Sequence, residues 1–227
     1  LEQAVQVIFH RSQLQGRTRG KGQMTAVALG ATAMQDILES TNLDTSICIA
    51  GINSARGVSL AGTVPALDEL ESTLTTRGIG FKRLDLDYAF HGPMMDDMQA
   101  ELRNSLSLLR PRAATIPMVS TVTGCRLAGH ELDAEYWWLN IRRPVQFESA
   151  IASALDGGST LFIEIGPHSI LKGYIDSITK DRPESSGRTI PTLARGDDAP
   201  DLVWAAASHA ILAGAPVDLS HHFPRAG

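Results

Sequence analysis

Cysteine is scarce in this chain of 227 residues, which contains only Cys48 and Cys125. They form no CxxC pair, and no histidine stands at metal-ligand spacing from either, which argues against a zinc site and a disulfide scaffold. We expect two buried free thiols, no metal and a reducing, cytoplasmic location. No apolar run approaches the ~20 residues needed to span a bilayer, and the first residues lack a signal-peptide pattern, so no membrane partner is predicted.

Positive charge is also in short supply. The chain has 20 Lys and Arg against 25 Asp and Glu, a net charge of −5, and no basic run. We therefore predict no nucleic-acid partner, and an acidic partner would need a local basic patch. The hydrophobic share of 43% is typical of a globular protein, and the length suits one domain that carries a smaller inserted one.

Apolar periodicity predicts alternating helices and strands. A helix over 1–15 is followed, over 23–90, by segments in the order β-α-β-β-α-β, which is typical of a ferredoxin-like unit. Strands over 116–124, 160–167 and 188–195 then alternate with helices over 94–109, 136–155 (broken at Arg143-Pro144) and 168–178. A last helix over 202–214 precedes a linker-like tail. The fold class is α/β, with a layered core and an inserted small subdomain.

Six segments in chain order carry a resemblance to a known family: VIFHRSQLQ, LDLDYAFHGPMMD, PMVSTVTG, EYWWLNIRRPVQF, LFIEIGPHSIL and IPTLARGDD. The chain resembles the acyltransferase domains of type I modular polyketide synthases and the malonyl transferases of fatty-acid synthesis. This resemblance implies a partial α/β-hydrolase-like core with the ferredoxin-like insert. It divides the chain into a helix of the large subdomain (1–20), the small subdomain (21–90), the rest of the large subdomain (91–189) and a linker (190–227).

The resemblance also implies an activity. Such a domain takes an extender acyl group from its coenzyme A thioester onto a serine and passes it to the phosphopantetheine of an acyl carrier protein. No cofactor is bound. The expected partners are the carrier protein and the neighbouring ketosynthase and linker domains of a multidomain synthase.

Two residues would carry the chemistry. His91 follows a predicted strand, and the resemblance makes it the general base, a role that suits an imidazole; a structural, hydrogen-bonded histidine is the alternative. Arg11 lies beside the helical stripe of Ala4, Val7, Ile8 and Leu14. The resemblance assigns it to the free carboxylate of malonyl-type substrates, which a guanidinium binds bidentately. The alternative is an arginine that extends to solvent.

Tyr88 and Phe90 are the specificity candidates. In the family, HAFH accompanies malonyl and YASH accompanies methylmalonyl, and YAFH mixes the two. Phe90 would fill the space beside the α-carbon of the substrate, so malonyl is favoured and methylmalonyl stays possible; plain core packing is the alternative for Phe90. Gly92 replaces a serine that is common in the family.

Two further positions follow from the resemblance. Asn53 matches a position near the acyl pocket, although a turn asparagine explains it equally well. The carbonyls of the loop 166–168 are expected to orient the imidazole of His91.

The serine elbow of the pattern GxSxG is missing. The nearest string, GVSLAG around Ser59, has its second glycine one position late, and we expect an ordinary strand serine there. The nucleophile is therefore expected in an N-terminal acyltransferase segment outside the chain, so that the chain alone is inactive. Two rivals remain: a non-catalytic docking platform within a synthase, and a hydrolase, which would not need Arg11 for a carboxylate.

Overall fold

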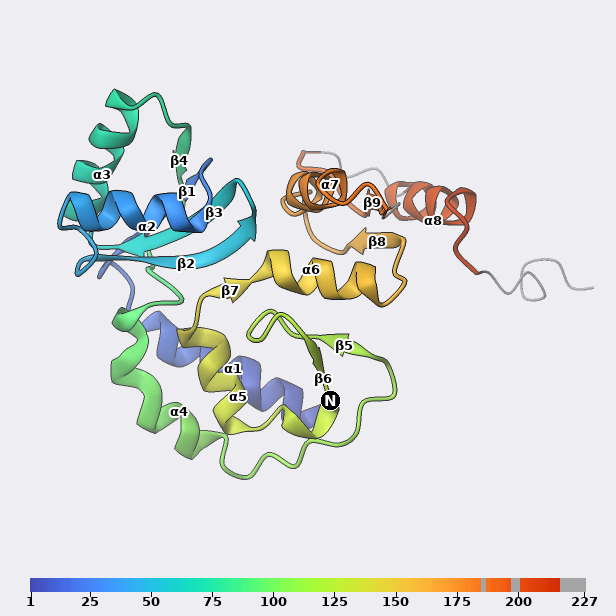
Figure 1. Ribbon diagram of the computed structural model, residues 1–227. Helices are drawn as coiled ribbons and strands as arrows, with labels where there is room; N and C mark the ends of the chain where they lie inside the picture. Colours follow the sequence, from blue (N-terminus) through green and yellow to red (C-terminus); the bar gives the residue numbers. More distant parts are fainter. Residues whose placement is uncertain (185–186, 197–200, 217–227) are drawn as a thin grey trace, which may run out of the picture. The chain divides into compact units, whose positions relative to one another are not determined.

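The computed structural model describes residues 1–184, 187–196 and 201–216 (Figure 1). Helices alternate with strands, as the sequence predicts for the α/β class. The chain divides into two compact units, Leu1–Ser153 and Ala154–Gly227. Each unit has its own packing, and the helix α6 (Phe147–Asp156) contains the point of division.

A mixed sheet with two helices forms the first part of the first unit. Its elements are β1 (Gln23–Val27), α2 (Ala31–Ser40), β2 (Ile47–Ser54), β3 (Gly57–Gly62), α3 (Val64–Thr76) and β4 (Phe81–Arg83). The strand order is β4-β1-β3-β2-β7, in which β7 (Val145–Gln146) joins β2 in parallel and the other pairs are antiparallel. The βαββαβ order is the one expected from the sequence.

The strand β4 is shorter than the predicted strand over 81–90. Arg83 of β4 pairs with Thr25, and the chain runs antiparallel to β1, which begins at Gln23. Residues after Asp85 therefore have no strand residue of β1 opposite them. Leu84 still donates its N–H to the carbonyl of Met24 at 2.9 Å, and the segment after it leaves the sheet as a loop, although its polar and apolar residues alternate.

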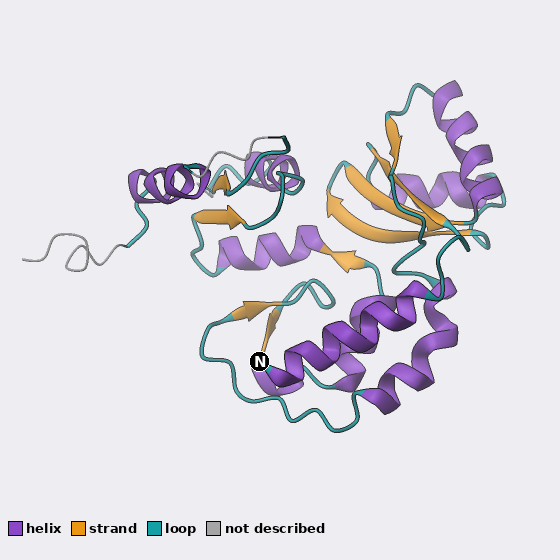
Figure 2. Cartoon of the chain, turned by 180° about the vertical axis from the view of Figure 1, so that it is seen from behind, coloured by secondary structure: helices purple, strands orange, loops and turns teal. Residues whose placement is uncertain are grey.

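Alternate strand residues point to opposite sides of this sheet, and both sides carry apolar residues. On one face, Leu38 of α2 and Leu70 of α3 pack with Val58 and Leu60 of β3. Figure 2 shows these helices beside the strands of the sheet. On the other face, a second cluster joins Met24, Ala50, Ala61 and Ala89, with Cys48, Leu84, Phe90 and Met94 packed against it. The second face therefore holds the loop that leads to His91.

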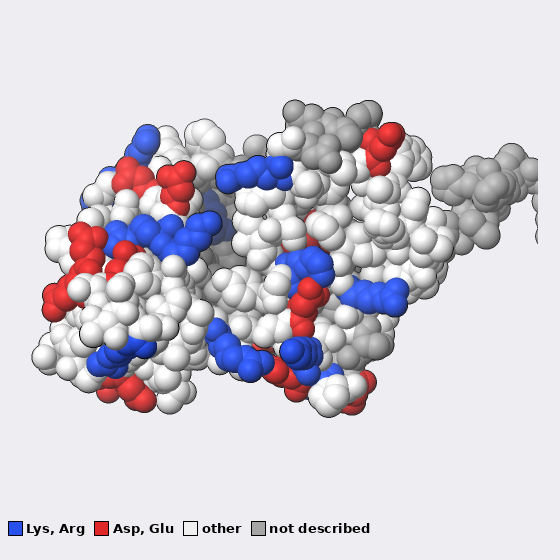
Figure 3. All heavy atoms as spheres, turned by 90° about the horizontal axis from the view of Figure 1, so that it is seen from above, with Lys and Arg blue, Asp and Glu red and all other residues white. Residues whose placement is uncertain are grey.

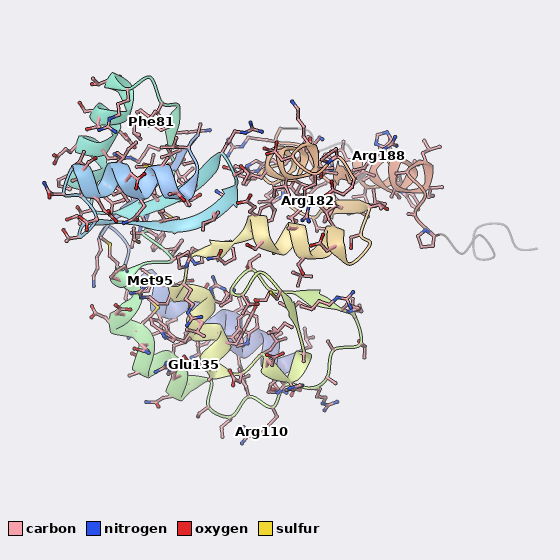
Figure 4. All side chains as sticks on the ribbon, viewed as in Figure 1. Phe81, Met95, Arg110, Glu135, Arg182 and Arg188 are labelled. Carbon is pink, nitrogen blue, oxygen red and sulfur yellow. The ribbon has the colours of Figure 1, made fainter. Side chains whose placement is uncertain are left out.

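Helices form the other part of the first unit. They are α1 (Glu2–Gly16), a 3-10 helix (Pro93–Met98), α4 (Gln99–Ser105) and α5 (Ala134–Arg142). Their shared core includes Val7 and Leu14 of α1, Leu102 of α4 and Ile141 of α5, and fully buried Met95 lies at the end of this layer next to the sheet (Figure 4). A short hairpin, β5 (Met118–Val119) and β6 (Arg126–Leu127), and a 3-10 turn (Gly129–Glu131) complete the unit.

The second unit contains β8 (Leu161–Glu164), α7 (Lys172–Lys180), β9 (Arg188–Pro191) and α8 (Leu202–Leu212). The strands β8 and β9 run parallel, from Leu161 opposite Arg188 to Glu164 opposite Pro191, and α7 connects them. Outside the large sheet, the described strands form two two-stranded sheets. The central sheet of an α/β-hydrolase-like core therefore stays a prediction, and part of the predicted linker, 197–200 and 217–227, lies outside the described residues.

The expectation of two buried thiols is wrong for Cys125, which is exposed, whereas Cys48 is half-buried. Cys125 lies in the turn between β5 and β6, in which Val122 is the side chain that packs into an apolar cluster. Within the described ranges, no helix is long and apolar enough to cross a membrane, and no group of His, Cys, Asp and Glu is placed to hold a metal ion. Basic and acidic side chains are intermixed on the face shown in Figure 3.

Candidate active site

His91 is held by two backbone carbonyl groups at the end of α5. Its N–H donates to the carbonyl of Ile141 at 3.1 Å, and its Nδ1 lies 3.1 Å from the carbonyl oxygen of Arg143. A carbonyl only accepts, so Nδ1 carries the proton and Nε2 keeps a free lone pair. The backbone of His91 has φ of 60°, a left-handed conformation that non-glycine residues rarely adopt.

The carbonyl groups of Ile141 and Arg143 are available to His91 because α5 ends at Arg142. The last carbonyl groups of a helix have no partner within the helix. Arg143 precedes Pro144 and is extended, with φ −80° and ψ 153°, as expected before a proline. The predicted break at Arg143-Pro144 is thus confirmed, and it frees the carbonyls of Ile141 and Arg143 for His91.

The resemblance predicts a carbonyl of the loop 166–168 as the acceptor for His91. That loop belongs to the second unit, so its part in holding the imidazole stays a prediction. The sequence alone does not identify Arg143 as a partner of His91. Any residue can supply a backbone carbonyl, so the residue type at position 143 gives no indication of this contact.

Burial lowers the pKa of His91, and the nearby positive charge of Arg11 lowers it further. The hydrogen bond to the carbonyl of Arg143 works in the opposite direction, but the net shift is downward. At neutral pH the imidazole is therefore uncharged and able to accept a proton.

Arg11 lies half-buried on α1, and neutral amides hold its guanidinium. Its Nη1 donates to Oδ1 of Asn140 at 2.6 Å, and its Nε donates to Oε1 of Gln15 at 3.3 Å. Burial lowers the pKa of Arg11, partly offset by Tyr136, and no carboxylate of the described residues pairs with it. Of the predicted apolar stripe, Val7 is buried but Ile8 is exposed.

The rings of Tyr88 and Phe90 are stacked, with centroids 5.0 Å apart and an interplanar angle of 11°. Phe90 also packs against both the second face of the sheet and the helical core. Phe90 therefore lies at the junction of the two parts of the first unit, directly before His91. Its role in substrate specificity stays a prediction.

Gly92 is buried against Cys48. A Cβ added at Gly92 would lie 2.5 Å from Sγ of Cys48, so a serine does not fit here without a shift. The same thiol lies 3.6 Å from the carbonyl oxygen of Ala61 and 3.9 Å from that of His91. Cys48 thus occupies the space that a side chain at position 92 would need.

Asn53 is a strand residue of β2, so the turn interpretation is wrong. The hairpin turn comes only after Ser54, and Nδ2 of Asn53 donates across to Oγ of Ser59 at 2.9 Å. Ser59 lies in β3, opposite Ala26 on one side and Gly51 on the other. It is the ordinary strand serine that the sequence predicted.

The family of acyl transferase domains matches residues 1–216 of the chain. Polyketide synthase GfsB of Streptomyces halstedii is 34% identical over 228 residues, which cover 100% of this chain and 4% of that protein. The mycoketide-CoA synthase of Mycobacterium tuberculosis is 33% identical over 220 residues, which cover 96% of this chain and 5% of that protein. The chain thus spans a small fraction of these relatives.

Solved structures agree with this relationship. The acyltransferase domain from module 8 of the salinomycin polyketide synthase is 32% identical, with a TM-score of 0.89, over 95% of this chain and 50% of that one. A loading acyltransferase from the avermectin modular polyketide synthase is 28% identical, with a TM-score of 0.84, over 93% of this chain and 65% of that one. By sequence and by fold, the chain belongs to the family of acyl transferase domains, in the form found in polyketide synthases.

Proposed function

We propose that the chain supplies the general base and the carboxylate-binding cation of an acyltransferase site that loads extender units in a polyketide synthase. One observation carries this proposal. His91 and Arg11, 80 positions apart in the sequence, both hydrogen-bond to residues 140–143 at the end of α5. The end of one helix therefore holds both groups that the reaction requires.

His91 would act as the base through Nε2. A serine from outside the chain loses its proton to Nε2, its oxygen attacks the thioester carbonyl, and coenzyme A leaves as the thiol after receiving that proton. The phosphopantetheine thiol of an acyl carrier protein then attacks the serine ester by the same steps in reverse. The uncharged imidazole and its protonated Nδ1 support this assignment.

Arg11 would bind the free carboxylate of the acyl group, because its guanidinium has further N–H groups beyond those bonded to Asn140 and Gln15. Phe90, stacked on Tyr88, would favour malonyl over methylmalonyl, and Asn53 is a weaker candidate for the acyl pocket. A pocket rejects one additional methyl group by only ~1–3 kcal/mol, so the preference is partial. The partners would be the carrier protein and the ketosynthase and linker domains of a cytoplasmic synthase.

The test uses a complete acyltransferase domain that contains these residues, incubated with labelled malonyl-coenzyme A. His91→Ala should reduce formation of the covalent acyl adduct by ~10²–10⁴-fold, the usual contribution of a general base. His130→Ala, at an exposed histidine, is the matched control and should load normally. Near-normal acylation of the His91 variant would refute the role of His91 as the base, whereas no acylation even of the unmodified domain would favour the docking-platform alternative.

A further inference from the structure

The end of α5 presents three successive groups toward the two candidate functional residues. The side-chain oxygen of Asn140 accepts from Arg11, the carbonyl of Ile141 accepts from the backbone of His91, and the carbonyl of Arg143 accepts from its ring. Ile141 is fully buried in the core of the helical layer, which fixes this turn in place. Asn140 is the member of the turn that contacts Arg11 through its side chain.

The choice of an amide at position 140 has an electrostatic consequence. Other arginines of the first unit are paired with carboxylates, such as Arg17 with Glu101 and Arg142 with Asp96. Among the described residues, the guanidinium of Arg11 instead donates to two neutral amide oxygens, those of Asn140 and Gln15. An amide oxygen orients a guanidinium without cancelling its charge, so the charge of Arg11 stays available to a ligand.

We propose that Asn140 is a positioning residue, which aims the guanidinium of Arg11 at the substrate carboxylate and leaves its charge uncompensated. This inference rests on the proposed function, because it requires Arg11 to bind an anionic acyl group. Asn140 itself contacts neither the substrate nor the reacting atoms. Its effect passes through the Nη1 hydrogen bond of 2.6 Å.

The decisive variant is Asn140→Asp, which keeps the size of the side chain and the oxygen that accepts from Arg11. It adds a negative charge that pairs with Arg11 and competes with the substrate carboxylate. A purely structural asparagine would tolerate this change, since the hydrogen bond remains and an ion pair is gained. The two roles therefore predict opposite results for substrate selection.

The measurement is kcat/KM of a complete acyltransferase domain for malonyl- and acetyl-coenzyme A in competition. Asn140→Asp should lower the ratio of malonyl to acetyl on the order of tenfold or more, mainly by raising KM for malonyl, with acetyl loading nearly unchanged. Asn140→Ala should lower the ratio less, because the charge persists but the guanidinium is less well oriented. Asn42→Asp, at an exposed asparagine after α2, is the matched control and should leave the ratio unchanged.

Arg11→Ala separates the inference from the proposed function. If Arg11→Ala leaves the ratio unchanged, the carboxylate-binding role of Arg11 is wrong. If Arg11→Ala lowers the ratio and Asn140→Asp does not, only the positioning role of Asn140 is wrong. Unchanged loading of both substrates by Asn140→Asp, with an unchanged or higher melting temperature, would identify a merely structural residue and overturn the inference.

Discussion

At the residue scale, the charge of Arg11 and the protonation of His91 are coupled. Burial is the main reason that the pKa of His91 is lowered, and Arg11 adds to this shift. A base is active only when deprotonated, so a lowered pKa keeps it active to a lower pH. The cation that would bind the substrate therefore also helps to keep the imidazole neutral.

Removing the positive charge of Arg11 should move the acidic limb of the pH profile of the acyl-loading rate. With acetyl-coenzyme A, which carries no free carboxylate, Arg11→Ala in a complete domain should raise the pKa of His91 and shift the limb to higher pH. Arg11→Lys keeps a positive charge and should leave the limb close to that of the wild type. Initial loading rates between pH 5 and 8 measure the effect, and identical limbs in all three proteins would contradict the coupling.

Gly92 and Cys48 should behave as a coupled pair. In Gly92→Ser, the new Cβ would lie 2.5 Å from Sγ of Cys48, and forced overpacking of this kind typically costs ~1–3 kcal/mol. Cys48→Ala removes the sulfur, so the double variant should regain most of the loss. Urea unfolding of the wild type, the two single variants and the double variant gives the coupling free energy. If the two single losses of stability simply add, the new side chain at position 92 does not press on Cys48 and the prediction is wrong.

At the element scale, the helices and strands were largely predictable, but the contacts between them were not. The βαββαβ order, the helix over 1–15 and the break at Arg143-Pro144 follow from local patterns and are present in the structure. The early end of β4 depends on where β1 begins, which no local pattern contains. Likewise, the sequence singled out Arg11 and His91 through the resemblance, whereas their shared contact with α5 required the fold.

The loop between β8 and α7 shows how one carboxylate shapes an element. Glu164, in the FIEIGPH segment, accepts from the hydroxyl of Ser169 and from the N–H groups of Ile170, Leu171 and Lys172. The predicted helix over 168–178 begins only at Lys172, because residues 165–171 form the loop bound by this carboxylate. Glu164, the last residue of β8, therefore caps the N-terminus of α7, although it lies seven residues before Leu171 in the sequence.

Glu164→Gln should destabilise the chain at neutral pH by about 0.5–2 kcal/mol, the usual range for a lost helix cap. Burial raises the pKa of Glu164, but the hydrogen bonds from Leu171, Ile170, Ser169 and Lys172 outweigh it and lower the pKa overall. The stabilisation is thus present above the unfolded-state pKa of ~4.3 and disappears as the pH falls through the lower folded value. Thermal unfolding at several pH values should show this loss in the wild type but not in Glu164→Gln.

The exposed residue Glu69 of α3 supplies the control for this experiment. Glu69→Gln removes the same charge without removing a cap, so it should change stability little at any pH. Equal effects of the two substitutions would mean that net charge, rather than the cap, determines the result.

At the scale of the whole molecule, α1 presents an apolar face that nothing in the described residues covers. Val5, Ile8 and Phe9 are 58%, 62% and 58% exposed, and the other side of the helix is buried through Val7 and Leu14. A face of this kind marks a contact surface. The salinomycin domain is about twice as long as the part of it that matches this chain.

The proposed serine from outside the chain leads to one prediction. The 227 residues alone, incubated with labelled malonyl-coenzyme A, should acquire no covalent acyl group, because a base and a cation without a nucleophile cannot form the ester. Ser59 is the serine closest to an elbow pattern, but it lies within β3 and accepts a hydrogen bond from Asn53. Ser59→Ala in a complete domain should therefore load normally. Mass spectrometry of intact protein measures both results, and a stable adduct on any serine of the isolated chain would refute the proposed division of the active site.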